Sequence, residues 1–348
     1  PAPAIVPCAS SAAEKASRAQ AVGLELGLLL LSALLFALSF PNFLSRWGWF
    51  PLAYIALVPV FLVIHRTGWL GAALYGALFG YLSYALHNYW LASFHPLTLV
   101  IVPPIYALYL LAVFLALKAA DVLFPRYGFV LQSALWVAYE LWKVQGFLAY
   151  SYGTMGYSQY LFQPLIRAAA LTGVWGISWL VVFPAAWLGN ALREGFSGFR
   201  AFLRRTWIPG ALWGLLFLAA VVYGLAGKVD LTRASSWRVA LVQQNIDPWR
   251  GGAKAYEQSL NILTRLSRRA VLENPEIVIW SETSFVPAID WHTRYRTDRE
   301  MYELVRRLRE FLATQPMPYL IGNDDGQLKR TETGREERVD YNATLLFQ

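Results

Sequence analysis

The feature that most constrains this chain is a series of long apolar runs confined to residues 22–226. A helix needs roughly 17–25 mostly apolar residues to cross a bilayer. We predict about seven such spans, at residues 22–40, 49–64, 69–91, 97–117, 129–142, 165–188 and 207–226. The fifth run is the shortest and contains Glu140, so the count depends most on this run. The sequence therefore predicts a polytopic α-helical membrane bundle over residues 22–228.

Charged residues divide the chain into two parts of different character. Residues 1–236 contain 14 Lys or Arg and 6 Asp or Glu, whereas residues 237–348 contain 16 of each class. The whole formal net charge of +8 thus lies in the apolar part. Positive charge placed there favours cationic loops on one side of a membrane over a nucleic-acid-binding face, so we expect no nucleic acid partner.

Cysteine and histidine are too few for a disulfide framework or a clustered metal site. The chain has one cysteine, Cys8, and four histidines at the scattered positions 65, 87, 95 and 292. Metal sites built from these residues need several of them at short, regular spacing. We therefore expect no bound metal and no cofactor.

Lysines and arginines favour one orientation of the bundle, because cytoplasmic loops are enriched in these residues. With seven spans, only Arg46, Lys143 and Arg167 fall in loops opposite the N-terminus. Nine fall on the side of the N-terminus: Lys15, Arg18, Arg66, Lys118, Arg126, Arg193, Arg200, Arg204 and Arg205. Residues 1–21 are therefore predicted to be cytoplasmic, and residues 229–348 to lie outside the cytoplasm.

Two carboxylates, Glu25 and Glu140, lie inside apolar runs, where a charge is costly unless it faces a cavity or a partner. Glu140 is predicted either to line a polar groove for a lipid headgroup or to be an ordinary helix-end carboxylate. The segment that follows, residues 145–163, opens with QGFLAYSYGTMGYSQ and is too polar to span. We interpret it as an interfacial loop over the bilayer surface.

After residue 237 the apolar pattern becomes that of a water-exposed α/β domain. Strands are predicted at 237–243, 276–280, 319–322 and 343–347, with helices at 253–272 and 295–313. The run EIVIW at 276–280 is continuously apolar, as in a strand buried on both faces. The stretch 323–338, which includes Asp324 and Asp325, is expected to be turn-rich. In such alternating folds, active sites lie at the carboxyl ends of the strands.

Glu282 follows the EIVIW strand by two residues and is the candidate catalytic residue. A carboxylate that leaves a dry strand is well placed to be a partly desolvated general base. An ordinary surface glutamate at a strand–loop junction is the alternative, and spacing alone leaves the two open.

Four motifs resemble a known family when they are taken in order. VALVQQNID, PEIVIWSETS, YLIGN and DYNATLLF resemble the first half of a carbon–nitrogen hydrolase (nitrilase-superfamily) domain. Preceded by a multi-span bundle with a GYSQ loop, they resemble the apolipoprotein N-acyltransferase family of bacterial envelopes. The resemblance implies an inner-membrane protein with a periplasmic nitrilase-like α-β-β-α sandwich, of which residues 229–348 would be the N-terminal half.

The resemblance also implies a ping-pong acyl transfer. A cysteine thiolate takes an acyl chain from a phospholipid, and the thioester then acylates the N-terminal amine of a diacylglyceryl-modified lipoprotein. The family's glutamate base matches Glu282. Its lysine follows the YN strand and its cysteine lies further on, whereas Lys329 precedes that strand and Cys8 precedes the first span. We therefore expect a C-terminally truncated, inactive domain.

Two more positions carry over from the family as candidate substrate-binding residues. Trp249 matches an aromatic that touches the acyl chain or headgroup, and it could equally be a capping aromatic on the next helix. Asn342 matches an asparagine beside the catalytic glutamate, where its amide could hold the carboxylate, and it could equally be an ordinary residue at a strand start.

Two rival functions remain at this point: a membrane-tethered amidase, and a non-enzymatic lipid transporter or scaffold. A transporter predicts paired inverted repeats and charges in the middle of spans, and neither is evident. An amidase would use the same Glu, Lys and Cys. However, seven spans are excessive for an anchor, whereas a lipid donor and a lipid-bearing acceptor both require a site at the bilayer surface.

Overall fold

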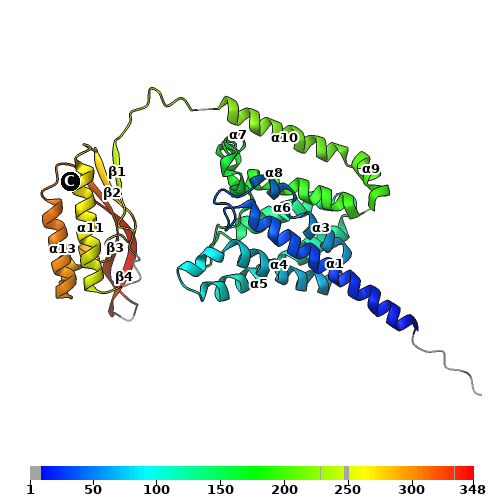
Figure 1. The fold of residues 1–348 in the computed structure, drawn as a ribbon, viewed down its shortest axis with the longest axis horizontal. Coiled ribbons are helices and arrows are strands. Elements are labelled where there is room, and N and C mark those ends of the chain that lie inside the picture. The colour runs from blue at the N-terminus through cyan, green and yellow to red at the C-terminus, as the bar shows by residue number, and fades with distance from the viewer. Residues whose placement is uncertain (1–8, 194, 228, 247–250, 333) are drawn as a thin grey trace, which may run out of the picture. The chain divides into compact units, whose positions relative to one another are not determined.

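The computed structural model describes residues 9–193, 195–227, 229–246, 251–332 and 334–348. These residues form two compact units, Pro1–Val229 and Asp230–Gln348, which are described separately below (Figure 1). Trp249 and Cys8 lie outside the described residues.

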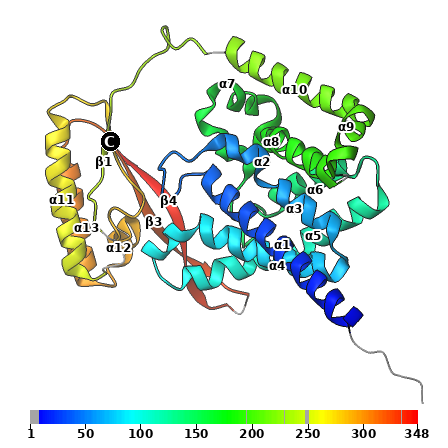
Figure 2. The ribbon, with the colours of Figure 1, turned by 45° about the vertical axis from the view of Figure 1, so that its right-hand side comes forward.

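Unit 1 is entirely helical in its described part. Its α-helices are α1 (Ala9–Ser39), α2 (Ala53–Ala56), α3 (Val58–Arg66), α4 (Trp69–His87), α5 (Thr98–Leu123), α6 (Gly128–Trp142), α7 (Gln163–Ile166), α8 (Ala169–Arg193), α9 (Gly195–Arg205) and α10 (Trp207–Ala226). Three short 3-10 helices connect them: η1 (Phe50–Leu52), η2 (Tyr89–Ser93) and η3 (Met155–Leu161). Figure 2 shows the long helices as one bundle, with α9 and α10 at its side.

Five of the described helices are long and apolar enough to cross a membrane. They are residues Ala16–Ser39 of α1 together with α4, α5, α8 and α10. The predicted count of about seven differs from this number at two places. The run at 49–64 is divided into the short helices η1, α2 and α3, and the run at 129–142 is the 15-residue helix α6.

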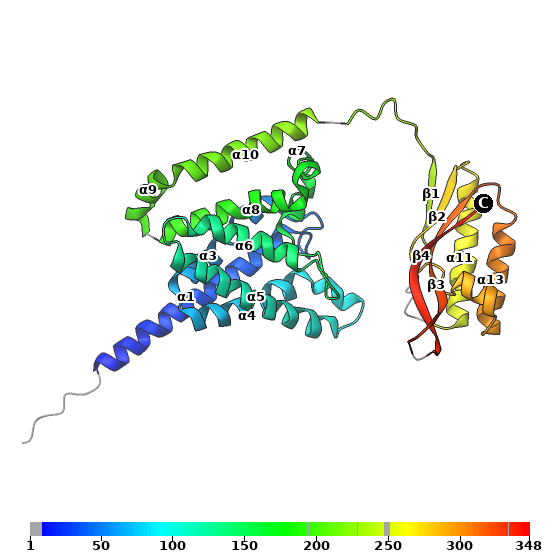
Figure 3. The same ribbon diagram turned by 180° about the vertical axis from the view of Figure 1, so that it is seen from behind.

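Close packing of α4 on α5 depends on two glycines one helical turn apart. A Cβ atom added to Gly76 would lie 2.5 Å from the carbonyl oxygen of Leu110, and one added to Gly80 would lie 2.4 Å from that of Tyr106. Small residues four apart let membrane helices approach to this distance. The two helices accordingly run side by side in all three views (Figures 1–3).

Unit 2 is an α/β unit built on one four-stranded sheet. Its elements are β1 (Val239–Val242), α11 (Ala253–Val271), β2 (Ile277–Trp280), α12 (Ile289–Tyr295), α13 (Arg299–Leu312), β3 (Tyr319–Arg330) and β4 (Glu336–Phe347). The strand order is β1-β2-β3-β4. The first two pairs are parallel and the last is antiparallel, so β1, β2 and β3 end at the same edge.

One face of this sheet is covered by helices. Leu260 and Leu263 of α11 and Leu304 and Leu308 of α13 are buried against it, as their helical spacing predicts. Figure 3 shows α11 and α13 on the same side of the sheet. On the other face large apolar side chains stay exposed within the unit, with Leu241 at 79% and Leu346 at 54%.

The prediction of a turn-rich stretch at 323–338 is wrong for most of these residues. Asp324 and Asp325 lie within β3, which pairs with β4 from Tyr319 opposite Phe347 to Arg330 opposite Glu336. Polar residues there are tolerated because one face of this long hairpin is exposed to water. The single turn of the hairpin lies at its tip, where the amide of Thr331 donates to the carbonyl of Arg335.

Candidate functional site

Glu282 lies in a tight turn immediately after the buried strand β2. The amide of Ser284 donates a 3.2 Å hydrogen bond to the carbonyl of Ser281, which closes the turn around Glu282 and Thr283. Thr283 has φ 58°, a left-handed conformation that is unfavourable for a β-branched residue. Such strain persists only where the surrounding structure enforces it, and here the loop that follows is held by hydrogen bonds from neighbouring elements.

Three side chains from three different elements hold the loop that follows Glu282. Nε2 of Gln244, just after β1, donates to the carbonyl of Ser284 at 3.2 Å, and Oγ of Ser259 in α11 donates to the same carbonyl at 2.7 Å. Asn323 in β3 donates to the carbonyls of Phe285 and Pro287 and accepts from the amide of Ile289. These bonds join the carboxyl ends of the three parallel strands into one edge.

Gly322 in β3 allows the neighbouring strand to approach the backbone of Glu282. A Cβ atom at this position would lie 2.8 Å from Cα of Glu282 and 3.0 Å from its backbone nitrogen. Real Cβ contacts are essentially never this short. The close approach brings Glu282 over β3 and towards β4.

The carboxylate of Glu282 is bound by Asn342 on β4. Nδ2 of Asn342 donates a 2.6 Å hydrogen bond to Oε1 of Glu282, across 60 residues of sequence. The contact that the family resemblance implies for this asparagine is therefore present. The described residues leave Glu282 exposed, however, so the partial desolvation expected from its position after a dry strand is absent among them.

A second carboxylate, which the sequence analysis assigned to a turn, lies beside this pair. Asp324 is directly opposite Asn342 in the antiparallel ladder of β3 and β4. Directly paired residues point to the same face of a sheet, with Cβ atoms about 4.5–5.5 Å apart. The sequence YLIGNDDG does not alternate in polarity, and Asp-Asp-Gly is typical of a turn, so the sequence held no signal for this strand extension.

Glu140, the candidate in unit 1, is completely buried near the end of α6. Its Oε1 accepts a 3.1 Å hydrogen bond from Nε1 of Trp136 and a 2.8 Å hydrogen bond from the amide of Met155. The carboxylate thus fixes the start of η3.

Residues 153–159 pack into the bundle, which differs from the interfacial loop expected for 145–163, whereas residues 145–149 are exposed. Met155, Ser158 and Gln159 are buried, and the amide of Gly156 donates to Oγ of Ser178 in α8 at 2.9 Å. Lys143 donates to the carbonyl of Tyr152 at 2.8 Å. Hydropathy could not predict this burial, because buried polar groups are tolerated when each finds a specific partner.

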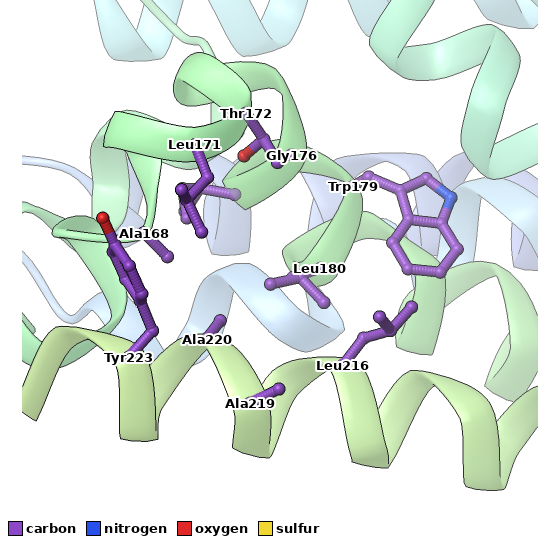
Figure 4. A pocket seen from close by; sticks show the side chains of 11 residues that line it. Ala168, Leu171, Thr172, Gly176, Trp179, Leu180, Leu216, Ala219, Ala220 and Tyr223 are labelled. Carbon is purple, nitrogen blue, oxygen red and sulfur yellow. The ribbon is translucent and has the colours of Figure 1, made fainter. Parts of the chain in front are cut away.

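An apolar pocket of about 430 Å³ lies between α8 and α10. Figure 4 shows Leu216, Ala220 and Tyr223 of α10 facing this space. On the side of α8 the lining includes Leu171, Leu180 and other residues of that helix. The lining is almost entirely apolar, so the pocket suits a hydrocarbon chain far better than a polar ligand.

No group of three or more His, Cys, Asp or Glu side chains that could hold a metal ion occurs within the described ranges. Within the described site, Glu282 and its amide partner Asn342 are the candidate reactive groups. Trp249, which would complete the set of sequence candidates, lies outside these ranges.

Comparison with known proteins shows similarity to one family over most of the chain. A family model described as the apolipoprotein N-acyltransferase N-terminal domain matches residues 32–187. Apolipoprotein N-acyltransferase 1 of Treponema denticola is 42% identical over 335 residues, which are 93% of this chain and 62% of that protein. The protein of the same name from Treponema pallidum is 42% identical over 93% of this chain and 61% of its own length.

A more distant relative agrees with these two. Apolipoprotein N-acyltransferase of Chlorobaculum tepidum is 30% identical over 91% of this chain and 60% of its own length. The chain spans about three fifths of the length of these relatives. A match over 93% of the chain includes most of both described units. The chain thus resembles the apolipoprotein N-acyltransferase family over most of its length.

Proposed function

We propose that this chain supplies the membrane bundle and the general base of a lipoprotein N-acyltransferase. In the proposed reaction an acyl chain passes from a phospholipid to a cysteine thiol and then to the N-terminal amine of a diacylglyceryl-modified lipoprotein. The observation that carries the proposal is the hydrogen bond between Asn342 and Glu282 at the shared edge of the parallel strands. The names of relatives that are 42% identical support it.

In this mechanism Glu282 takes the proton of the thiol. The thiolate attacks the ester carbonyl of the phospholipid, and the proton is returned to the departing alcohol of the lysophospholipid. In the second half-reaction Glu282 takes a proton from the amine as the amine attacks the thioester carbonyl. The C–S bond then breaks, and the proton passes to the departing cysteine thiolate. Asn342 keeps the carboxylate in one orientation by donating to Oε1, which leaves Oε2 to carry the proton.

No cysteine of this chain serves as the nucleophile in this proposal. The sequence contains a single cysteine, Cys8, which precedes the first apolar helix. The family lysine would stabilise the oxyanion of the tetrahedral intermediate, and Lys329 does not take this role in the proposal. Lys329 lies on the hairpin with its ammonium 5.0 Å from the ring centre of Tyr341. By itself the 348-residue chain is therefore expected to form no thioester.

We further propose that residues 229–348 contribute to a nitrilase-like α-β-β-α sandwich. Support comes from the uncovered face of the sheet, where Val239, Leu241 and Leu346 are exposed within the unit. Contiguous apolar surface of this kind marks a face that packs against another layer. A second sheet placed there would also cover Glu282 and provide the desolvation that the described residues lack.

We propose that the protein lies in the bacterial inner membrane with unit 2 on the periplasmic side. Residues 1–21 would be cytoplasmic, residues 22–228 would form the bundle of about seven spans, and residues 229–348 would be periplasmic. Support comes from the nine-to-three distribution of Lys and Arg between the two sides. Five spans and seven spans are both odd numbers, so either count places the two ends of the bundle on opposite sides.

The remaining candidates receive separate roles. Trp249 would contact the acyl chain or headgroup, as the family resemblance implies. Glu140 would act on lipid binding indirectly, because its bond to Met155 fixes the segment at the end of the bundle. The phospholipid would leave the bilayer beside the pocket between α8 and α10, whose apolar lining suits one acyl chain.

The proposal is tested with a chimera in which this chain is extended by the C-terminal segment of the Treponema denticola relative that lies beyond the match. The chimera is reconstituted with labelled phospholipid and a diacylglyceryl-modified peptide. The expected result is transfer of label to the peptide amine, lost in the Glu282→Gln variant and retained in Glu300→Gln, an exposed glutamate of α13. Release of ammonia from small amides without transfer of label would instead favour the amidase.

A further inference from the structure

A second pocket in unit 1, of about 440 Å³, is lined largely by arginines. It lies where α8 ends and α9 and α10 meet, next to the connection between α5 and α6. Its lining consists of Pro125, Arg126, Arg193, Phe202, Arg205 and Thr206. Three guanidinium groups around one cavity form a site for an anion, because each presents several N–H donors in a fixed geometry.

Arg193 is held in place at the wall of this pocket. Its guanidinium donates to Oδ1 of Asp121 at 3.1 Å, and its side chain is only 18% exposed. Asp121 also binds Nζ of Lys118 at 3.2 Å and Nδ1 of His65 at 3.2 Å. One carboxylate thus faces two permanent cations, so this cluster keeps a net positive charge beside the pocket.

The floor of the pocket is apolar and well packed. Phe202 is buried, and its ring meets that of Phe129 edge-on at 5.9 Å. The hydroxyl of Thr206 donates to the carbonyl of Phe202 and accepts from Nε1 of Trp187, both at 2.8 Å. A ligand in this pocket would therefore meet cationic groups at the rim and hydrocarbon beneath them.

Helix α9 has the character of a helix that lies in a membrane interface. Phe199, Phe202 and Leu203 pack against the core of unit 1, while Arg200 and Arg204 are exposed on the other side. The segment 193–205 contains four arginines and one glutamate. A basic polar face combined with a Phe- and Leu-rich face is typical of helices bound at the headgroup level of anionic membranes.

The pocket also lies at the depth of the headgroups. Arg193 is the last residue of the candidate span α8, and Trp207 is the first residue of the candidate span α10. The polar end of one span and the beginning of the next mark the boundary between hydrocarbon and headgroups. Basic pockets between membrane helices on the Lys- and Arg-rich side are suited to anionic lipids.

We propose that this pocket binds the phosphate-bearing headgroup of an anionic phospholipid. Arg126, Arg193 and Arg205 would contact the phosphate, and the acyl chains would leave along the apolar sides of α8 and α9. The occupant proposed here is a lipid bound at the end of the bundle where Lys and Arg gather. It is distinct from the acyl donor, and the inference does not depend on acyl transfer.

The test uses the full 348-residue chain in a neutral detergent. Phosphatidylglycerol and phosphatidylcholine with the same acyl chains are titrated separately, and both the unfolding temperature and the lipid retained in native mass spectrometry are measured. Arg126→Gln/Arg205→Gln removes two charges from the pocket. The matched control, Arg200→Gln/Arg204→Gln, removes two charges from α9 at positions that do not line it. Arg193 is left intact because it binds Asp121.

The proposal predicts that phosphatidylglycerol stabilises the wild-type chain more than phosphatidylcholine does. The pocket variant should need at least roughly tenfold more phosphatidylglycerol for half of the effect, because it loses two charge-assisted contacts to the phosphate that the control variant keeps. The control variant should stay within about twofold of the wild type. Melting of both variants at the wild-type temperature in phosphatidylcholine would show that they fold. If the double variant of the pocket does not fold, the single variant Arg126→Gln takes its place.

Three results would overturn the proposal. Equal losses in the pocket and control variants would mean diffuse attraction to a basic surface. Equal stabilisation by the two lipids would exclude selection of an anionic headgroup. The same stabilisation by inorganic phosphate at equal concentration would assign the pocket to a free anion instead of a lipid.

Discussion

Asn342 on β4 donates a 2.6 Å hydrogen bond to the carboxylate of Glu282, which follows β2 and is 60 residues away in the sequence. The strand between them, β3, contributes Gly322, whose missing side chain leaves room for the backbone of Glu282. The pair therefore depends on three adjacent strands, and each of them can be tested separately. The activity measurements below use the chimera described under the proposed function.

Asn342→Ala should slow formation of the thioester about five- to tenfold while leaving unit 2 folded. The net contribution of one hydrogen bond is about 1 kcal/mol, which corresponds to a factor of about five in rate. Asn342→Asp should be slower still, because it places a second carboxylate against Glu282. The measurement is the rate of thioester formation from labelled phospholipid. Gln327→Ala removes another amide from the same hairpin and should leave this rate unchanged, and an equal loss in both variants would contradict a positioning role for Asn342.

Gly322→Ala should displace the turn that carries Glu282. The new methyl group would overlap the backbone of Glu282, and overpacking of this kind costs about 1–3 kcal/mol. We expect a lower unfolding temperature of unit 2 together with slower thioester formation. The control is Gly214→Ala in α10, where a Cβ atom would meet nothing within 4 Å. Wild-type rates in Gly322→Ala would show that the close approach of β3 does not position the base.

Unit 2 should become less stable near α12 as the pH falls through about 6.5. Burial of His292 lowers its pKa, an effect that nearby Arg338 reinforces and Asp298 opposes. The folded state therefore holds the neutral ring, whereas the unfolded state takes up a proton near the ordinary value of 6.5, so stability present above this pH is lost below it. Hydrogen exchange of α12 at pH 7.5 and 5.5, corrected for intrinsic rates, measures the effect. His292→Gln should remove the pH dependence, and its persistence in this variant would assign it to another group.

Residue 332, at the tip of the hairpin, should be accessible from the periplasmic side of the inner membrane. Glu332 is exposed, so Glu332→Cys should react with a membrane-impermeant maleimide in intact spheroplasts. The native Cys8 is the internal reference, because the proposed topology places it in the cytoplasm and predicts labelling only after lysis. Labelling of Cys8 but not of residue 332 in intact spheroplasts would show that the topology is the reverse of the one proposed.

Sequence patterns predicted the elements whose environment is uniform along their length. Long apolar runs predicted α4, α5, α8 and α10, because a membrane span must be apolar on every side. The buried positions Leu260 and Leu304 followed from helical spacing. Glu282 was identified from its place after a buried strand, a rule that depends only on the order of the elements.

Features that depend on contacts between distant residues were not predictable in this way. The extension of β3 through Asp324 and Asp325 relies on pairing with β4, which overrides the turn preference of these residues. Burial of Met155 relies on its bond to Glu140. The arginine pocket brings Arg126 together with Arg193 and Arg205. Hydropathy and charge counting predict an excess of positive charge on the cytoplasmic side but not that these three side chains line one cavity.

The central claim is that Glu282 is the general base, and trapping of the thioester tests it most directly. The chimera is incubated with labelled phospholipid in the absence of any acceptor, and the label bound to protein through a hydroxylamine-sensitive bond is measured. Glu282→Gln keeps the size of the side chain and an acceptor for Asn342, so folding should be preserved. A general base contributes about 10²–10⁴-fold, so the account predicts that thioester formation falls by a factor near the upper end of this range, while Glu300→Gln matches the wild type. Normal yield and rate of the thioester in Glu282→Gln would contradict the account.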